Sequence, residues 1–299
     1  MDYAKVFKTM IAETQAYLEN NHLQAMILGI SGGLDSTVTA AICHEVEKRN
    51  PELKFIGISL PCSSNTTEEN DSATICMKAF CKSGQWWTEN LQKEYMLMRA
   101  TCSQRHLMTT IGQGNIKARL RMTYLYNEAN YFKGLVMDTD NLTEHYLGFF
   151  TIHGDVCDFN PIGGLWKHEV YELAQYLYNE YYQCPFGSDG DKHVALEHAL
   201  NIRPTDGKGV NDLGDMGQIA PAFAYCKNVD AYTKVDDIIK TYLTYKSDLY
   251  KEAENTTIEA LYNEYGKETV DGIIRRINST EYKRKKLPIV IERNHYEFL

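Results

Sequence analysis

The sequence contains none of the features that mark zinc-binding, membrane-spanning or nucleic-acid-coating proteins. Its eight cysteines form no C-x-x-C pair and no Cys/His cluster with the spacing of a zinc site. No apolar run approaches the ~20 residues that cross a bilayer, and the first 18 residues carry Asp2, Lys5 and Lys8 where a signal peptide has an apolar stretch. The 40 acidic residues outnumber the 31 basic ones, which argues against binding nucleic acid through bulk charge. We therefore expect a cytoplasmic protein with reduced thiols and with neither a membrane nor a nucleic-acid partner.

The chain also lacks internal repeats, low-complexity tracts and a linker that would divide it into two parts. Its 299 residues are 43% hydrophobic and 24% charged, which is ordinary for a globular protein. A chain of this length can bury enough surface to fold without a disulfide or a structural metal. We expect residues 1–299 to form a single domain.

Apolar runs and helical spacing alternate along the first 183 residues. Residues 25–31 are a continuous apolar run of the kind that forms buried parallel strands, and 54–61 is interpreted in the same way. We also expect strands over 85–91, where Trp86 and Trp87 make the period ambiguous, and over 134–139. Such alternation predicts an α/β fold, a doubly wound parallel sheet with helices on both faces. We expect helices over residues 3–20, 38–49, 65–81, 92–103, 114–132, 142–150 and 166–183.

The rest of the chain has a different pattern. Residues 184–218 are rich in Gly, Asp and Pro and lack periodicity, so we expect a long lid or binding loop there. The last 70 residues return to helical spacing and include the basic run Lys283–Lys286. They predict a helical C-terminal part.

A glycine-rich loop, Gly29–Thr37, stands between the first expected strand and the helix after it. Backbone amides at such a turn point outward, and the helix N-terminus adds partial positive charge, so the loop suits an anion. The adjacent Gly32 and Gly33 let the backbone approach that anion closely, and Ser31 and Ser36 add hydroxyl groups. A tight turn that merely caps the helix is the alternative.

The loop matches neither of the two commonest phosphate-binding patterns. Its glycines do not fit G-x-G-x-x-G, and no lysine precedes Ser36 as a Walker loop requires. Asp35 stands there instead. Because a carboxylate repels phosphates unless a divalent cation lies between them, Asp35 indicates Mg²⁺ bound to phosphate oxygens.

The S-G-G-x-D-S pattern resembles the PP-loop of ATP pyrophosphatases, which cleave ATP between the α and β phosphates. Further segments are similar to those of one family in that group, the NAD synthetases, and they follow in the family's order. The segment Asn115–Met122 (NIKARLRM) matches a signature of that family, as do Met137–Glu144 and Gly148–Thr151. Weaker matches are Gly154–Pro161, Arg203–Thr205, Asp212–Asp215 and Thr280–Arg284.

The resemblance implies an adenine nucleotide alpha hydrolase-like fold and a reaction. Deamido-NAD⁺, ATP and ammonia give NAD⁺, AMP and pyrophosphate through an adenylated intermediate. It implies Mg²⁺ at Asp35 and Glu144, and a homodimer, for which the tyrosines along 124–131 would be suitable. The implied contacts to ATP are Gly29, Ile30, Ser31, Gly32, Gly33, Leu34, Asp35, Ser36, Thr139, Lys167 and Thr205. The implied contacts to deamido-NAD⁺ are Arg119, Asp158, Tyr282 and Lys283. The catalytic residues are Asp35, Lys167 and Asp155, and we infer that Asp155 admits or deprotonates ammonium.

The chain departs from the family pattern at a few positions. Ile152 stands where the family has a lysine, Tyr282 where it has a histidine, and Cys62 where it has an arginine or tyrosine. We expect a basic residue such as Lys192 or Lys208, or else His153, to replace the lysine missing at Ile152.

Two other functions stay open. One is a different PP-loop enzyme, amidating or tRNA-thiolating, although the acidic composition speaks against tRNA. The other is a non-catalytic nucleotide-binding module, which the joint presence of Asp35, Glu144 and Lys167 speaks against.

Overall fold

A computed structural model describes residues 1–299 except 63, 184–186, 188, 206–213, 248–253 and 286–299. Its described part contains a four-stranded parallel sheet in the order β3-β2-β1-β4, which confirms the predicted α/β class. The strands are β1 Ala25–Gly29, β2 Lys54–Ser59, β3 Trp86–Thr88 and β4 Gly134–Met137.

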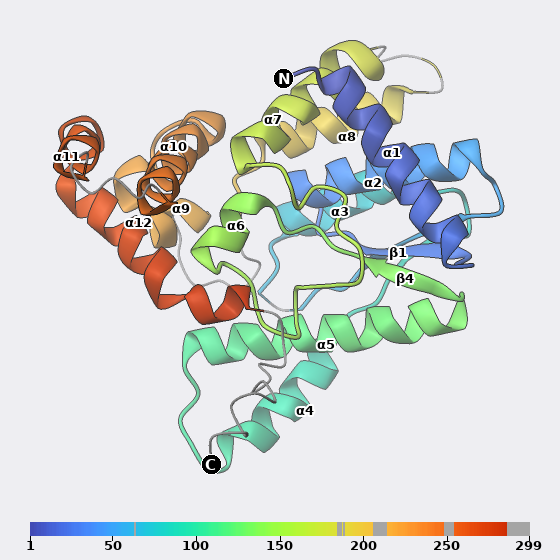
Figure 1. Ribbon diagram of the computed structural model, residues 1–299. Coiled ribbons are helices and arrows are strands. Elements are labelled where there is room, and N and C mark those ends of the chain that lie inside the picture. Colours follow the sequence, from blue (N-terminus) through green and yellow to red (C-terminus); the bar gives the residue numbers. More distant parts are fainter. Residues whose placement is uncertain (63, 184–186, 188, 206–213, 248–253, 286–299) are drawn as a thin grey trace, which may run out of the picture.

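Helices surround this sheet on both faces (Figure 1). They are α1 Tyr3–Asn20, α2 Leu34–Arg49, α3 Thr67–Phe80, α4 Gln92–Ser103, α5 Thr110–Tyr131, α6 Leu142–Leu147, α7 Lys167–Tyr176, α8 Gly190–Asn201, α9 Gly214–Ile219, α10 Asn228–Ser247, α11 Glu254–Tyr265 and α12 Lys267–Ser279. A π-helical turn, Leu177–Tyr181, continues α7, and 3₁₀ turns cover Pro221–Phe223 and Glu281–Arg284.

Alternate residues of β1 belong to two different cores. Met26 and Leu28 pack with α1, α2 and α7, whereas Ala25 and Ile27 pack with α4 and α5. Because successive side chains of a strand point to opposite faces, a strand covered on both sides is apolar throughout. This explains why the chain shows a continuous apolar run here.

The strand order creates the crevice in which a ligand can bind. The chain moves outward from β1 to β2 and β3, and then returns to the other side of β1 with β4. The connections therefore diverge between β1 and β4, whose register pairs Leu28 with Met137. In open α/β sheets, ligands bind outside the carboxyl ends of the strands at such a switch point.

The C-terminal helices α10, α11 and α12 lie together at one end of the molecule (Figure 1). Helix α10 packs on α7 and α6, and α12 packs on α6. Val235 of α10 and Ile273 of α12 belong to the same hydrophobic core as the α2 side of the sheet. The helical C-terminal part is thus confirmed, and it shares its core with the sheet.

The structure corrects the expected loop over 184–218, since residues 190–201 form helix α8 and 214–219 form α9. The buried face of α8 consists largely of small residues, such as Gly190, Ala195 and Ala199, and packs on α3. A face of that kind produces little hydrophobic periodicity, which is why the sequence pattern missed it. The helix expected over 142–150 ends at Leu147, because Gly148 adopts a left-handed conformation with φ of 58°.

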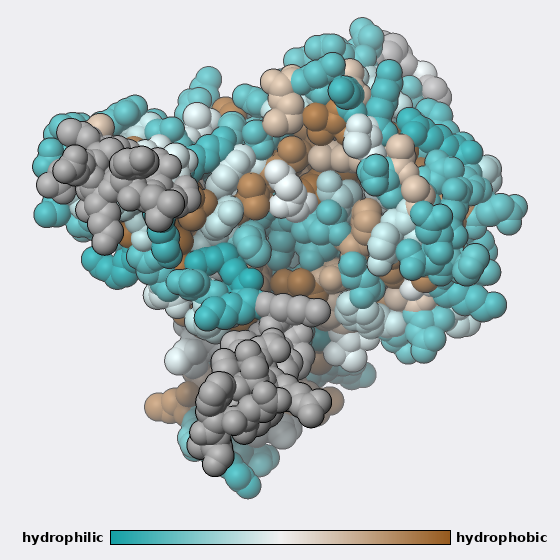
Figure 2. Space-filling view, viewed as in Figure 1, coloured by the Kyte–Doolittle hydropathy of each residue, from teal (hydrophilic) through white to brown (hydrophobic). Residues whose placement is uncertain are grey.

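The surface seen in Figure 2 is mostly hydrophilic, with apolar side chains visible mainly in the hollows between elements. Within the described residues, each helix is too short or too polar to cross a membrane. The seven described cysteines are all free thiols, and four of them are buried. Cys184 lies outside the described residues.

The turn between β1 and α2 depends on one glycine of the adjacent pair. Gly32 has a φ of 80°, and a Cβ built there would lie 2.3 Å from the backbone nitrogen of Ala73 in α3. Gly33 has a φ of −75°, and a Cβ there would meet only the Ser31 hydroxyl, at 3.4 Å. Gly32 therefore permits the close packing of the loop on α3.

We predict that Gly32→Ala lowers the free energy of unfolding by about 2–4 kcal/mol, because it adds both backbone strain and a steric clash. The matched variant Gly33→Ala should lose no more than about 1 kcal/mol, the usual difference between glycine and alanine at a helix N-cap. Urea unfolding of both variants measures this, and equal losses would contradict it.

Candidate functional site

A cavity of about 290 Å³ lies at the carboxyl ends of β1, β2 and β4. The glycine-rich loop, α3, α5, α7 and the segment 202–205 contribute to its walls. The predicted site residues that line it are Gly29, Ile30, Ser31, Gly33, Leu34, Asp35, Thr139, Glu144, Asp155, Lys167 and Thr205.

The hydroxyl groups of the glycine-rich loop differ in burial and in hydrogen-bond partners. Ser36 and Thr37 are buried, and both donate to the Gly33 carbonyl, at 3.0 and 2.9 Å. Ser31 is exposed at the cavity and accepts from the Gly33 N–H at 3.2 Å. The two buried hydroxyls therefore shape the turn, while Ser31 and the backbone face the cavity.

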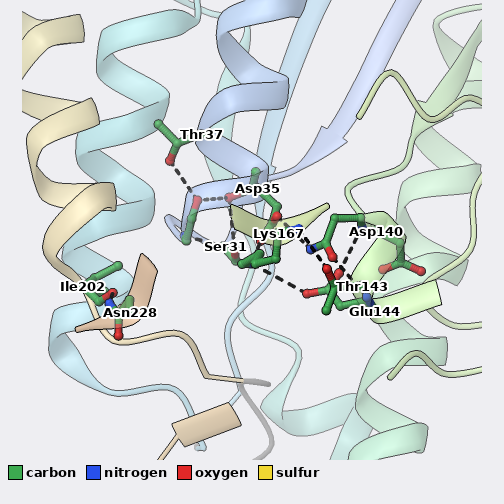
Figure 3. A network of polar contacts seen from close by, with 12 residues as sticks. Ser31, Asp35, Thr37, Asp140, Thr143, Glu144, Lys167, Ile202 and Asn228 are labelled. Atoms are coloured by element: carbon green, nitrogen blue, oxygen red, sulfur yellow. Dashed lines mark hydrogen bonds and ion pairs between the residues drawn. The ribbon is translucent and has the colours of Figure 1, made fainter. Parts of the chain in front are cut away.

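The centre of the site is a lysine between two carboxylates (Figure 3). Lys167 begins α7, and its Nζ donates to Asp35 at the start of α2 and lies 3.7 Å from Glu144 Oε1 of α6. Its side chain is only 3% exposed and also lies over the Tyr232 ring. Burial opposes the charge of Lys167, but Asp35 and Glu144 outweigh burial and raise the pKa of the ammonium group.

Asn141 donates a hydrogen bond to each of the two carboxylates. Its Nδ2 donates to Asp35 Oδ1 at 3.1 Å, and its backbone N–H donates to Glu144 Oε2 at 3.1 Å. Asn141 also caps α6, since its Oδ1 accepts from the Glu144 backbone N–H at 3.0 Å. The pattern Asn-x-x-Glu is a capping box, so the sequence contained this signal. Burial, with a contribution from Asp35, raises the pKa of Glu144 to about 8.

The donor set at this centre fits Mg²⁺. Asp35 and Glu144 are both half-buried, with side chains 16% exposed. Across the described part of the chain, no group of three or more acidic, histidine or cysteine side chains is arranged to hold a metal. Asp35 and Glu144 offer two hard oxygen ligands in the cavity wall, and Mg²⁺ characteristically takes its remaining ligands from phosphates and water.

An acidic corner lies where the chain leaves β4. Buried Asp138 accepts hydrogen bonds from the backbone N–H groups of Asp140 and Cys157, both at 2.7 Å. Burial raises the pKa of Asp138 to about 6 and that of Asp140 well above its usual value. Asp155 accepts from the Thr151 N–H at 2.5 Å and lines the cavity. Burial therefore favours the protonated forms of Asp138 and Asp140 at this corner.

The opposite wall includes residues that the sequence patterns had not assigned to the site. Arg121 lines the cavity and donates to the Leu60 carbonyl at 2.9 Å and to Asn65 Oδ1 at 3.0 Å. Thr205, which is predicted to contact ATP, also lines this wall and donates to Glu69, which was not predicted. Arg121 belongs to the NIKARLRM segment, which contained the signal for it.

Four predicted dinucleotide contacts, Arg119, Asp158, Tyr282 and Lys283, lie outside the cavity lining. Arg119 donates to the Ile152 carbonyl at 3.2 and 3.3 Å. Asp158 accepts from the Tyr126 hydroxyl at 2.8 Å and from the Val136 N–H at 2.9 Å. Tyr282 is exposed. The contacts of these four residues with deamido-NAD⁺ stay predictions.

The C-terminal basic segment binds the end of α6. Lys283 Nζ donates to the carbonyls of Gly148 at 2.8 Å and Phe150 at 2.5 Å. Arg284 donates to the Tyr146 carbonyl at 2.7 Å, and Arg276 donates to the Leu147 carbonyl at 3.0 Å. Cations are favoured there, because the last turn of a helix carries partial negative charge. These contacts hold the helix that carries Glu144.

The expected replacement for the family lysine is not supported at Lys192. This residue is buried in α8, pairs with Asp189 and lies over the Tyr182 ring, and it does not line the cavity. Ile152 is half-buried, and His153 is exposed. Lys208, Asp212, Leu213 and Lys286 lie outside the described residues.

Comparisons with known proteins identify similar sequences and folds. The family model described as NAD synthase matches residues 6–185. The NH(3)-dependent NAD(+) synthetase of Carboxydothermus hydrogenoformans is 39% identical over 212 residues, which cover 69% of this chain and 75% of that protein.

Two solved structures share the fold over 98% of this chain. One is the NH3-dependent NAD synthetase from Campylobacter jejuni in complex with nitrate, with 25% identity and a TM-score of 0.67 over 100% of its own chain. The other is an NMN synthetase from Francisella tularensis, with 21% identity and a TM-score of 0.72 over 99% of its chain. With the family model covering more than half of its residues, this chain belongs to the NAD synthase family.

Proposed function

We propose that the chain catalyses the ATP-dependent amidation of deamido-NAD⁺ by ammonia to NAD⁺, with release of AMP and pyrophosphate. The observation that carries the proposal is the meeting of Lys167, Asp35 and Glu144 beside the glycine-rich loop, in a cavity at the switch point of the sheet. Such a site offers backbone amides, one ammonium group and two carboxylates to a polyphosphate. The names of the similar proteins support ammonia as the nitrogen donor.

The first step requires the nicotinate carboxylate to attack the α-phosphorus of ATP. The new bond joins the carboxylate oxygen to phosphorus, and the bond to the β-phosphate oxygen breaks, so that pyrophosphate leaves. Lys167 and the amides of the 29–36 loop stabilise the phosphate charge as it develops. Asp35 and Glu144 would hold Mg²⁺, which supplies further neutralisation of the phosphates when bound.

The second step replaces AMP by nitrogen. Ammonia attacks the carbonyl carbon of the adenylate, the added nitrogen loses one proton to solvent, and AMP leaves with the former carboxylate oxygen. Asp155, at the acidic corner of the cavity, accepts the proton that ammonium must lose before its nitrogen can attack. We assign Thr139 and Thr205 to ATP contacts, and Arg119, Asp158, Tyr282 and Lys283 to deamido-NAD⁺.

The remaining proposals concern the localisation, oligomeric state and domain organisation of the enzyme. We propose a cytoplasmic homodimer in which residues 1–299 form one domain. The core shared by the sheet and α10–α12 supports the single domain. The exposed rings of Tyr126 and Tyr131 on α5 support a partner contact on that helix.

The reaction itself is tested by its products. With ATP, ammonium, Mg²⁺ and deamido-NAD⁺, we expect mass spectrometry to detect NAD⁺, AMP and pyrophosphate in equal amounts. Formation of ADP would refute the proposal. A parallel sample with nicotinate mononucleotide tests the substrate class, because the NMN synthetase shares the fold. Faster amidation of the mononucleotide would overturn deamido-NAD⁺ as the substrate.

We predict that Asp35→Asn lowers the rate of pyrophosphate release by about 10²-fold or more, because one of the two carboxylates that would hold Mg²⁺ at the phosphates loses its charge. It should also destabilise the protein by about 3–5 kcal/mol, since Lys167 loses its closest buried partner. Glu144→Gln should show a similar loss of rate. Asp71→Asn, an exposed carboxylate on α3, is the control and should behave like the wild type. Unchanged pyrophosphate release by folded Asp35→Asn would exclude the role.

We predict that glutamine does not replace ammonium as the nitrogen donor of the purified 299-residue chain. Glutamine hydrolysis by a cysteine requires an activated thiolate, and among the described cysteines Cys157 lines the cavity. Burial and the neighbouring Asp138 raise the pKa of that thiol, which keeps it protonated. NAD⁺ formation with each donor at equal concentration measures this. Comparable rates would contradict it.

A further inference from the structure

A buried carboxylate outside the cavity joins the two helices that carry Lys167 and Glu144. Asp236 lies on α10 with 0% exposure, and it does not line the cavity. Its Oδ1 accepts a hydrogen bond from the Thr143 hydroxyl. Its Oδ2 accepts from the His168 backbone N–H at 3.0 Å and contacts His168 Nδ1 at 2.8 Å.

These contacts reach the residues directly beside the charged centre. Thr143 precedes Glu144 on α6, and its Oγ1 accepts from the Lys167 backbone N–H at 2.8 Å. His168 follows Lys167 on α7. The first backbone N–H groups of a helix have no partner within the helix, so external acceptors fix the position of that turn. Asp236 and Thr143 supply those acceptors at the N-terminus of α7.

The charge of Asp236 is compensated from several sides. It lies at the positive end of α7, which favours a negative charge. The His168 ring stands between Asp236 and Lys240, whose Nζ lies 3.5 Å from His168 Nε2. Lys240 in turn lies over the ring of Trp166. A buried carboxylate is tolerated where hydrogen bonds and opposite charges satisfy it in this way, and losing its partners is costly.

We propose that Asp236 is a positioning residue that acts through Thr143 and His168 to hold Lys167 and Glu144 in their reactive places. The role rests on the proposed function. Lys167 is the first residue of α7, so a shift of that turn moves its ammonium group relative to the phosphates. Misplacement of a catalytic group by 1 Å can cost about 10²-fold in rate. Asp236 also lies beyond the residues that the family model matches.

Steady-state kinetics of four variants test the proposal. Asp236→Asn and Thr143→Ala should lower kcat by about 10- to 100-fold with less than about a threefold change in KM for ATP, because the interaction that they weaken acts in the transition state. Thr143→Ser keeps the hydroxyl and should stay within about twofold of the wild type. Asp237→Asn changes the neighbouring carboxylate, which accepts a hydrogen bond from Tyr265 of α11. The kcat of this variant should also stay within about twofold of the wild-type value. Tm values verify that each variant is folded.

Activity within twofold of the wild type in both Asp236→Asn and Thr143→Ala would overturn the proposal. So would equal losses in Thr143→Ala and Thr143→Ser that follow their Tm values, because a purely structural role predicts them. Wild-type protein in the same assay must form NAD⁺, and its failure would refute the proposed function instead. In that case, amide hydrogen exchange tests the positioning role without an activity assay. Thr143→Ala and Asp236→Ala should accelerate exchange of the Lys167 and His168 amides, and unchanged exchange would overturn the positioning role.

Discussion

The charge balance around the Lys167 ammonium group is the constraint on which the site depends. A lysine that is 3% exposed is stable in its charged form only beside negative groups, and Asp35 and Glu144 provide them. These three residues come from α7, α2 and α6, so the three helices must meet at one point. The sheet brings them there, because β1 leads into α2 and β4 leads into α6 at the same edge.

The electrostatics of the cavity explain how an acidic protein can bind a polyanion. Asp138, Asp140 and Asp155 surround one corner, and burial raises the pKa values of the first two. In the proposed reaction, phosphates are attracted by a small set of groups: the loop amides, Lys167, Arg121 on the far wall and a divalent cation that Asp35 and Glu144 would hold. Asp155 also lines the cavity at this corner, and it is the carboxylate for which we propose the role of proton acceptor from ammonium.

The helices beyond the sheet contribute to the site by holding α6 and α7. Asp236 of α10 binds the start of α7 through His168 and reaches α6 through Thr143. Lys283 binds the carbonyls that follow α6. Helix α6 is only six residues long, and so short a helix has little stability of its own. Its position, and with it that of Glu144, therefore depends on these contacts from the C-terminal part.

The sequence by itself determined what depends on neighbouring residues. The alternation of apolar runs and helical spacing predicted four strands, the glycine-rich loop predicted an anion site, and Asp35 beside it predicted a cation. The tertiary structure decided what depends on distant residues: that Asp35 is half-buried against Lys167, that Arg121 and Glu69 form a wall of the cavity, and that 190–201 is a helix. Periodicity and turn chemistry act over a few residues, whereas a buried ion pair arises only when packing brings separate helices together.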